Sequence, residues 1–267
     1  MKKNDFNNNI IELRGNCLFV SDAHFQVPAS NDDRNREQLL ISMLKQHENL
    51  DHLFLLGDIF DFWFEYRDVA PKGYFNLFHY LDKLNKNGTT IHFFTGNHDM
   101  WIRNYFTESF GAITYFKPQI FLINDKKFII GHGDGIGGKQ RKYMLIKSIL
   151  NFNPNKVLYS SLHPRIAFSL ARYCSRKSRS SHSENDSVFK AEAEFQVAFA
   201  RDILRSQSID YFIFGHRHIP TLYKLDENTI FYNTGDWINN FSFVKFYVSD
   251  ICPELTFFNS KENLDEH

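Results

Sequence analysis

Five short apolar runs in this 267-residue chain each end in polar, chemically reactive side chains. The runs read CLFVSDAH, HLFLLGDIFD, IHFFTGNHD, FIIGHGD and YFIFGHRH. Each predicts a buried strand of about four to six residues followed by a turn. Their hydrophobicity is continuous rather than alternating, which is typical of strands covered on both faces. The chain is therefore constrained to a layered fold with buried sheets.

Helical patterns accompany these runs over 33–47, 72–87 and 187–206. Strands that alternate with helices favour an α/β fold. Further along, TLYKLDE, TIFYNTGDW, FSFVKFYVSD and ELTFFN predict an antiparallel meander. The length permits one large domain or two small ones, and we predict a single domain over 1–267.

Composition excludes several classes of protein. The hydrophobic fraction of 43% suffices for a large core, yet no run approaches the roughly 20 apolar residues of a membrane-spanning helix. Cys17, Cys174 and Cys252 are scattered and odd in number, so we expect a reducing compartment rather than a disulfide framework. The first residues, MKKNDFNNNIIELRGN, lack an apolar h-region, so no signal peptide is expected.

The polar side chains at the ends of the five runs form the candidate site. Ligands bind beyond the carboxyl ends of strands in open α/β sheets, so we expect these side chains to converge. One Gly-Asp or Gly-His after a strand is usually a turn or a cap, but five such groups crowded together are expensive to bury without cations. Imidazole, carboxylate and amide ligands suit Mn, Fe, Zn or Co better than a Cys-rich zinc site. The groups are Asp22 with His24, Asp58 with Asp61, Asn97 with His98 and Asp99, His132 with Asp134, and His216 with His218.

The ordered series DxH, GDxxD, GNHD, GHGD and GHxH resembles the calcineurin-like metallophosphoesterase superfamily, with NTGDW at 233–237 as a further match. The resemblance implies a four-layer α/β/β/α sandwich of two mixed sheets and a dinuclear metal site. It implies that His98 stabilises the transition state or protonates the leaving group, with Asp61 accepting its other N–H; a purely structural His98 is the alternative. By motif, it implies one cation held by Asp22, His24, Asp58 and His218, and a second held by Asp58, Asn97, His132 and His216.

The stretches GDIFDFWFEY, FFTGNHDMW and GHGDGIGGKQRKYMLIK extend these motifs. They are similar to the UDP-2,3-diacylglucosamine hydrolases of lipid A synthesis. That resemblance implies hydrolysis of UDP-2,3-diacylglucosamine to UMP and 2,3-diacylglucosamine 1-phosphate, by attack of metal-activated water on the α-phosphorus. It implies two divalent cations, Mn first and Fe, Zn or Co as alternatives, and substrate contacts from Asn97, His98 and Trp63. His98 departs from the pattern, because the best-studied members have Arg there.

A basic segment over 135–183 contains no Asp or Glu and ten of the 31 Lys and Arg residues of a chain with zero formal net charge. It lies between two metal-binding motifs, and we predict a helical cap at about 137–185. Two short amphipathic helices, broken near Pro154 and at Pro164, would line an acyl-chain pocket. Ordinary packing of the apolar positions and a solvated basic surface are the alternatives. The predicted substrate contacts are Lys139 and Arg141, and the predicted phosphate or membrane contacts are Arg176, Lys177 and Arg179.

These features predict a cytoplasmic enzyme that rests on the anionic cytoplasmic face of the inner membrane, and they leave its oligomeric state open. One alternative is another metal-dependent phosphodiesterase or phosphatase that acts on a nucleotide or another anionic phosphoester. A second alternative is a non-catalytic scaffold, which the seven competent ligand positions argue against. A pI near 7.2 argues against a dedicated nucleic-acid-binding protein.

Overall fold

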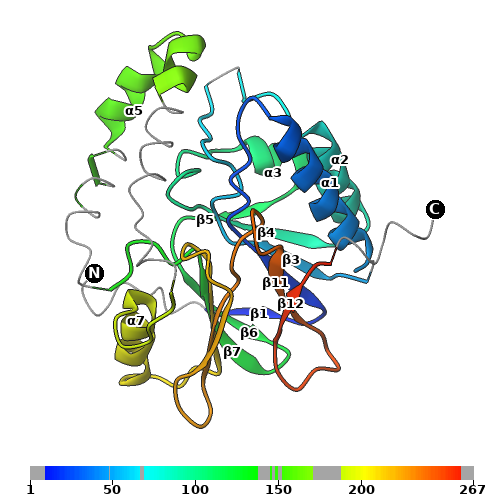
Figure 1. The fold of residues 1–267 in the computed structure, drawn as a ribbon, viewed down its shortest axis with the longest axis vertical. Helices are drawn as coiled ribbons and strands as arrows, with labels where there is room; N and C mark the ends of the chain where they lie inside the picture. The colour runs from blue at the N-terminus through cyan, green and yellow to red at the C-terminus, as the bar shows by residue number, and fades with distance from the viewer. Residues whose placement is uncertain are drawn as a thin grey trace.

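A computed structural model gives the fold (Figure 1) and describes residues 10–47, 49–66, 69–137, 145, 148–149, 152–170 and 188–259. Within this part, two six-stranded sheets form the body of the molecule. The first sheet has the order β12-β11-β2-β3-β4-β5. Its strands β2 to β5 run parallel, and β11 and β12 are antiparallel to their neighbours. The strands are β2 (Cys17–Val20), β3 (His52–Leu55), β4 (Thr90–Phe94), β5 (Ile113–Tyr115), β11 (Ser242–Phe246) and β12 (Glu254–Phe257).

The second sheet has the order β1-β6-β7-β8-β10-β9 and is also mixed. Parallel pairs join β1 to β6, β7 to β8 and β8 to β10, whereas β6–β7 and β9–β10 are antiparallel hairpins. The strands are β1 (Ile11–Leu13), β6 (Gln119–Ile123), β7 (Lys126–Gly131), β8 (Tyr211–Phe214), β9 (Thr221–Lys224) and β10 (Ile230–Asn233).

The predicted antiparallel meander is confirmed as two hairpins, β9–β10 and β11–β12, and is wrong as one continuous sheet. Its four runs form strands, but β9 and β10 belong to one sheet and β11 and β12 to the other. Local alternation predicts a strand without fixing its partner, since β10 finds its parallel neighbour β8 and β11 its neighbour β2 through long-range packing.

Three hydrophobic cores account for the continuous apolar runs. Phe19 and Phe54 of one sheet stack at 4.6 Å between their ring centroids and face Phe128 of the other sheet. The opposite face of the first sheet, with Leu18 and Val20, packs against the helices on that side. A third core covers the outer face of the second sheet. Both faces of the central strands are thus buried, and the predicted four-layer α/β/β/α arrangement is confirmed.

Helices α1 (Asn31–Lys45), α2 (Phe75–Lys86) and α3 (Tyr105–Phe110) cover the first sheet, and α7 (Phe195–Leu204) lies beside the second (Figure 1). Ser30 caps α1 because its hydroxyl accepts the Asp33 N–H, while the Asp33 carboxylate accepts the Ser30 N–H at 2.8 Å. Helix α7 begins at Phe195, later than the pattern predicted, because residues 191–193 form a turn.

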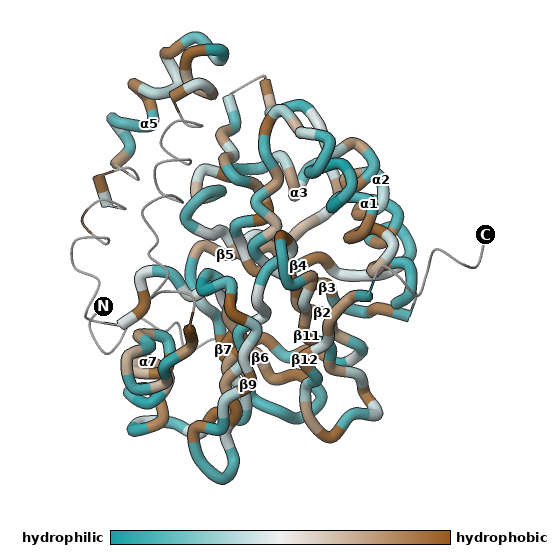
Figure 2. The backbone as a smooth tube through the Cα atoms, viewed as in Figure 1, coloured by the Kyte–Doolittle hydropathy of each residue, from teal (hydrophilic) through white to brown (hydrophobic). Residues whose placement is uncertain are grey.

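Helix α5 (Asn153–Ser160) lies within the predicted cap and stands apart from the two sheets (Figure 1). Residues 164–170 are also helical. The two prolines begin these helices rather than break them, since Pro154 occupies the first turn of α5 and Pro164 starts the next helix. Hydrophobic residues lie along α5 (Figure 2), and Val157 and Leu158 are largely exposed. None of the helices in the described ranges has the length and apolar character needed to cross a membrane.

Candidate metal centre

Five loops that follow β2, β3, β4, β7 and β8 meet at one edge shared by the two sheets. Backbone hydrogen bonds join these loops. The Asp22 N–H donates to the Gly57 carbonyl at 3.1 Å, and the His24 N–H donates to the Asp58 carbonyl at 2.9 Å. Parallel strands of one sheet end at the same edge, so ligands from distant parts of the sequence come together there.

The backbone at this edge adopts an unusual conformation. Asp22, His24, Asp58, His216 and His218 all have positive φ, between 45° and 70°. Such residues cost of the order of 1–3 kcal/mol each and persist only where surrounding structure imposes them. Strain of this kind clusters at functional sites, and here it coincides with five of the seven predicted ligands.

Possible ligand atoms form three overlapping groups in the described part of the chain. The atoms of each group lie within 4.8 Å of one another. Adjacent groups share His24 or Asp58, so together they make one continuous site. The groups are Asp22 with His24 and His218, His24 with Asp58 and His98, and Asp58 with His132 and His216.

Asp58 is the carboxylate common to the two halves of this site. Its Oδ1 accepts the His98 backbone N–H at 2.8 Å. Its Oδ2 lies 3.6 Å from His24 Nε2 and 3.3 Å from His132 Nε2. Asn97 completes the second half, because its Oδ1 lies 3.2 Å from the same His132 nitrogen. One oxygen of Asp58 therefore faces ligands on both sides.

Asp22 occupies the other end of the site. Its Oδ2 accepts the His216 backbone N–H at 2.8 Å and the Ser21 hydroxyl. Its Oδ1 lies 3.4 Å from His218 Nε2 and 3.7 Å from His24 Nε2. Asp22 Oδ1 and both ring nitrogens of His24 are buried and lack a hydrogen-bond partner among the described residues. Unsatisfied buried polar atoms of this kind are what a bound cation compensates.

Acceptors on the far side of the imidazoles orient them. His132 Nδ1 lies 2.8 Å from the Leu56 carbonyl oxygen. A carbonyl can only accept, so Nδ1 carries the proton and the Nε2 lone pair faces Asp58. His218 Nδ1 lies 3.4 Å from Asp236 Oδ2, and its Nε2 faces Asp22. These outer contacts set the tautomer that a metal-binding histidine requires.

Electrostatics at the site favour cations. Burial alone raises the pKa of Asp58, but the charges of His132 and His98 hold it well below its usual value. Burial lowers the pKa of His24, yet contacts with Asp22 and Asp61 outweigh it and raise that pKa to about 10. The carboxylates are thus ionised and draw positive charge, which protons or metal ions can supply. The mixed oxygen and nitrogen donor set fits two divalent cations.

Asp61 holds His98 differently from the expectation. The Asp61 backbone carbonyl accepts the His98 Nδ1–H at 2.9 Å, whereas the nearest Asp61 carboxylate oxygen lies 3.7 Å from that nitrogen. The same carboxylate oxygen lies 3.6 Å from His24 Nδ1. The Asp61 side chain therefore lies next to the candidate ligand His24, and the Asp61 backbone fixes the tautomer of His98.

The expectation that Trp63 contacts substrate is wrong. Its side chain is 1% exposed and packs in the core against Phe60 and Phe106. Its indole N–H donates to Glu65 Oε1 at 3.1 Å. Trp101, by contrast, is only partly buried and lines a cavity, whereas Phe106 lies in the core.

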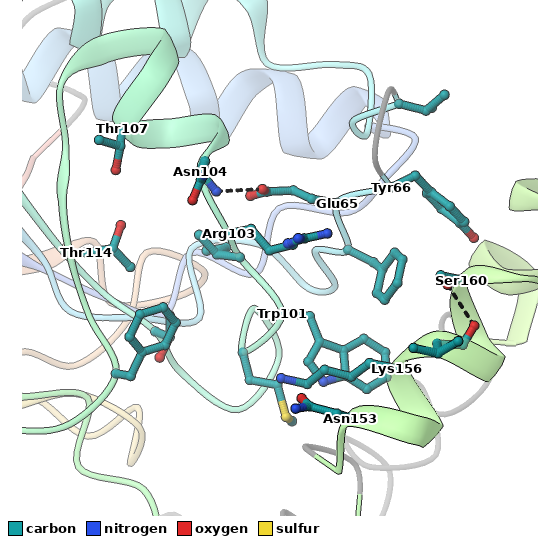
Figure 3. Close-up of a pocket in the computed structure, with 17 residues that line it drawn as sticks. Glu65, Tyr66, Trp101, Arg103, Asn104, Thr107, Thr114, Asn153, Lys156 and Ser160 are labelled. Carbon is teal, nitrogen blue, oxygen red and sulfur yellow. Dashed lines mark hydrogen bonds between the residues drawn. The ribbon is translucent and has the colours of Figure 1, made fainter.

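A cavity of about 1200 Å³ separates the body from α5 (Figure 3). Thr95 and Met100, which flank the Asn97 loop, line it. Tyr159 of α5 holds the helix on the body by packing 5.0 Å from the Trp101 ring. The walls combine aromatic rings with two cations and one carboxylate, and include Phe64, Glu65, Tyr66, Trp101, Arg103, Phe116 and Lys156.

The five basic residues predicted from the segment 135–183 lie outside the described residues, and their contacts remain predictions. They are Lys139, Arg141, Arg176, Lys177 and Arg179.

Two residues that support the site were not assigned a role from the sequence. Asp236 contacts His218. It lies in the NTGDW stretch, and the match of that stretch to the family pattern was the only feature of the sequence that pointed to a role for Asp236. Arg36 of α1 is buried and donates to the carbonyls of Ala23 and Trp237, so it ties together two loops of the site. No local sequence motif predicts that an arginine inside a helix will donate to the carbonyls of two distant loops.

Comparison with known proteins identifies the family of this chain. Residues 15–220 match the family model of the calcineurin-like phosphoesterases. A relative from Porphyromonas gingivalis (strain ATCC BAA-308 / W83), named UDP-2,3-diacylglucosamine hydrolase, is 32% identical over 241 residues, which cover 85% of this chain and 92% of the relative. A relative of the same name from Hamiltonella defensa is 26% identical over 217 residues, with 78% and 79% covered. A dimetal phosphatase from Danio rerio superposes with a TM-score of 0.43 at 13% identity, covering 92% of this chain and 99% of that one.

The family model spans all five motifs from Asp22 to His218. The chain therefore belongs to the calcineurin-like phosphoesterase family and is a metal-dependent hydrolase.

Proposed function

We propose that this enzyme hydrolyses the diphosphate bond of UDP-2,3-diacylglucosamine, releasing UMP and 2,3-diacylglucosamine 1-phosphate. The relatives that bear this name support the substrate. The observation that carries the proposal is the large cavity whose wall includes Thr95 and Met100, on either side of the loop that carries Asn97 and His98. Its volume of about 1200 Å³ exceeds the roughly 300–1,000 Å³ typical of small-molecule pockets, as a diacylated sugar requires.

The chemistry of the cavity suits an amphiphile with an anionic centre. The rings of Phe64, Tyr66 and Trp101 offer apolar surface for acyl chains. Arg103 and Lys156 line the same cavity and have no carboxylate within ion-pair distance among the described residues. Burial and the charge of Arg103 lower the pKa of Lys156, as expected for two cations without an anion between them. Lys139 and Arg141 are proposed to add further phosphate contacts.

Two divalent cations, which we propose to be Mn²⁺, would supply Lewis-acid activation of a water and of the phosphoryl oxygens. Asp22, His24, Asp58 and His218 would hold one, and Asp58, Asn97, His132 and His216 the other. Asp58, whose Oδ2 faces both His24 and His132, would be the shared ligand. The chain also holds the imidazoles in the required tautomers and excludes bulk water through buried loops.

His98 has a separate role in this proposal. Its Nδ1–H donates to the Asp61 carbonyl, so Nε2 must also carry a proton before it can donate a hydrogen bond to a phosphoryl oxygen. Burial lowers the pKa of the ring in the protein alone, and the negative charge of a bound diphosphate would raise it. The leaving group of a diphosphate is itself a phosphate, which departs without a proton from an acid. We therefore assign His98 to positioning the reacting phosphate and stabilising the transition state.

We propose a cytoplasmic enzyme that rests on the anionic inner membrane face. Exposed apolar residues gather within the acid-free stretch of the cap segment, and include Leu145, Ile149, Phe152, Val157, Leu158 and Ile166. Apolar residues next to basic ones suit an interfacial segment. Co-sedimentation with vesicles containing anionic lipid should fall for Leu158→Gln and stay unchanged for Leu222→Gln, an exposed leucine on β9.

Phosphorus-31 NMR of UDP-2,3-diacylglucosamine incubated with the Mn²⁺-loaded protein tests the substrate. UMP and the sugar-lipid 1-phosphate should appear with the wild type and be absent with Asp58→Ala and Asn97→Ala. Asp82→Asn, on the outer helix α2, is the matched control and should retain activity. If the lipid stays intact while a simple aryl phosphodiester is cleaved, the proposed substrate is wrong although the metal site is functional.

A further inference from the structure

The short connection between the two sheets carries a feature that the proposed chemistry does not use. Phe116 follows β5 of the first sheet and leads through Lys117 and Pro118 into β6 of the second. Its side chain is 60% exposed. A large exposed aromatic ring beside a functional site indicates a contact surface rather than part of the core.

The backbone on both sides of Phe116 is fixed against loops of the site. The Tyr115 carbonyl accepts the Thr95 N–H at 2.9 Å, two residues before Asn97. On the other side, Pro118 packs so closely on Gly131, which precedes His132, that an added Cβ at Gly131 would lie 3.0 Å from the proline ring. The Phe116 backbone is thus held between the loops that supply Asn97 and His132.

A cavity of about 250 Å³ opens at this connection. Phe116, Pro118 and Ile136 give it apolar walls, and the predicted ligand His132 lines it as well. It shares Thr95 and Phe116 with the larger cavity under α5, so the two spaces adjoin. Another small cavity, of about 320 Å³ near Glu108, is lined by none of the predicted metal ligands.

We propose that the 250 Å³ cavity binds the nucleoside half of the substrate, with the Phe116 ring stacking on the uracil ring. This inference rests on the proposed function. The bond that is cleaved has an acylated sugar on one side and a nucleotide on the other. The large cavity suits the acylated sugar, and this smaller one, bordered by the same site, suits a flat heterocycle between apolar walls. Lys117 and Asp134 also line it, and in this proposal they would offer a donor to the phosphate and an acceptor to the ribose hydroxyls.

Isothermal titration of the Mn²⁺-loaded protein with UMP and with ribose 5-phosphate tests this subsite, because the second ligand lacks the base. Phe116→Ala should weaken UMP binding about 5- to 150-fold and leave ribose 5-phosphate binding unchanged. Phe116→Tyr should restore UMP binding. Ile113→Ala, which removes an exposed apolar side chain from the adjoining strand β5, is the matched control and should have no effect.

Equal affinity of the wild type for UMP and ribose 5-phosphate would overturn the inference. Equal losses for both ligands in Phe116→Ala, or no loss, would do so as well. The hydrolysis assay separates the two proposals. Base-dependent UMP binding without cleavage of the UDP-linked lipid would refute the proposed substrate and leave the subsite standing. Cleavage of the lipid without base-dependent binding would refute the subsite alone.

Discussion

A series of hydrogen-bonded, uncharged side chains outside the candidate metal centre makes the stability of the protein sensitive to acid. The His52 Nε2–H donates to the Arg14 carbonyl at 3.2 Å, which leaves His52 Nδ1 as an acceptor. His92 Nε2 lies 3.3 Å from that nitrogen and must donate to it. His92 Nδ1 therefore accepts the Tyr115 hydroxyl at 3.1 Å. The hydrogen bonds in this series require both histidines to be neutral.

The size of this loss of stability in acid follows from the pKa of His92. Burial, together with the charge of His52, lowers this pKa from 6.5 to about 3. A depressed histidine pKa means that the unfolded chain binds a proton more readily, so stability is complete above pH 6.5 and is lost as the pH falls toward 3. At pH 4.5 the contribution of His92 to the free energy of unfolding is about 2.7 kcal/mol lower than above pH 6.5. The two pH values differ by two units, and each unit contributes about 1.36 kcal/mol. Burial also lowers the pKa of His52, which acts in the same direction.

His92→Phe isolates this contribution, because the ring that stacks 4.3 Å from Phe54 is retained while the titrating nitrogens are removed. The variant should be about 1–3 kcal/mol less stable at pH 7, since it leaves the His52 nitrogen and the Tyr115 hydroxyl without their partner. Between pH 7 and 4.5 it should lose about 2.7 kcal/mol less than the wild type.

Urea denaturation at pH 7 and at pH 4.5 measures how much the free energy of unfolding changes in each protein. EDTA is present throughout, and both proteins contain the same histidines at the candidate metal centre, so the contribution of those histidines cancels. His163→Gln at an exposed position controls for the loss of a histidine. If the wild type and His92→Phe lose the same stability between pH 7 and 4.5, the neutral chain of hydrogen bonds does not exist as described.

Three further predictions concern the site. Arg36→Met should lower the free energy of unfolding by about 3–5 kcal/mol and weaken Mn²⁺ binding, with partial recovery in Arg36→Lys; unaltered Mn²⁺ affinity in a calorimetric titration would show that Arg36 does not position the loops. His98→Ala should reduce kcat roughly 10²- to 10⁴-fold while plasma mass spectrometry still finds two cations per chain, and loss of a cation would make His98 a ligand. Gly57→Ala places a Cβ 2.7 Å from the Gly96 nitrogen at a φ of 85°, so thermal denaturation should show a loss of more than about 1 kcal/mol; a wild-type Tm would contradict this close approach.

The fold and the clustering of the candidate ligands could be predicted because each depends on a short stretch of sequence. A buried strand requires a continuous apolar run, and the strand end that follows it must carry the ligand, so HLFLLGD specifies both in seven residues. The helix ends of α1 and α2 were predicted to within about three residues for the same reason.

Features that depend on distant partners escaped prediction. The strands at Ile113–Tyr115 and Gln119–Ile123 are short, and only their neighbours in the sheets make them strands. Trp63 and Trp101 lie in the same aromatic region, and the sequence does not reveal which ring faces the core. The role of Arg36 depends on the carbonyls of two loops, one of them 201 residues away.

The most direct test of the central claim is phosphorus-31 NMR of the reaction run in ¹⁸O-enriched water with the Mn²⁺-loaded enzyme. Attack of water on the α-phosphorus predicts that the ¹⁸O isotope shift appears in UMP and that the sugar-lipid 1-phosphate keeps its original oxygens. A label in the sugar-lipid 1-phosphate would place the attack on the other phosphorus. An intact lipid substrate would contradict the proposed function itself.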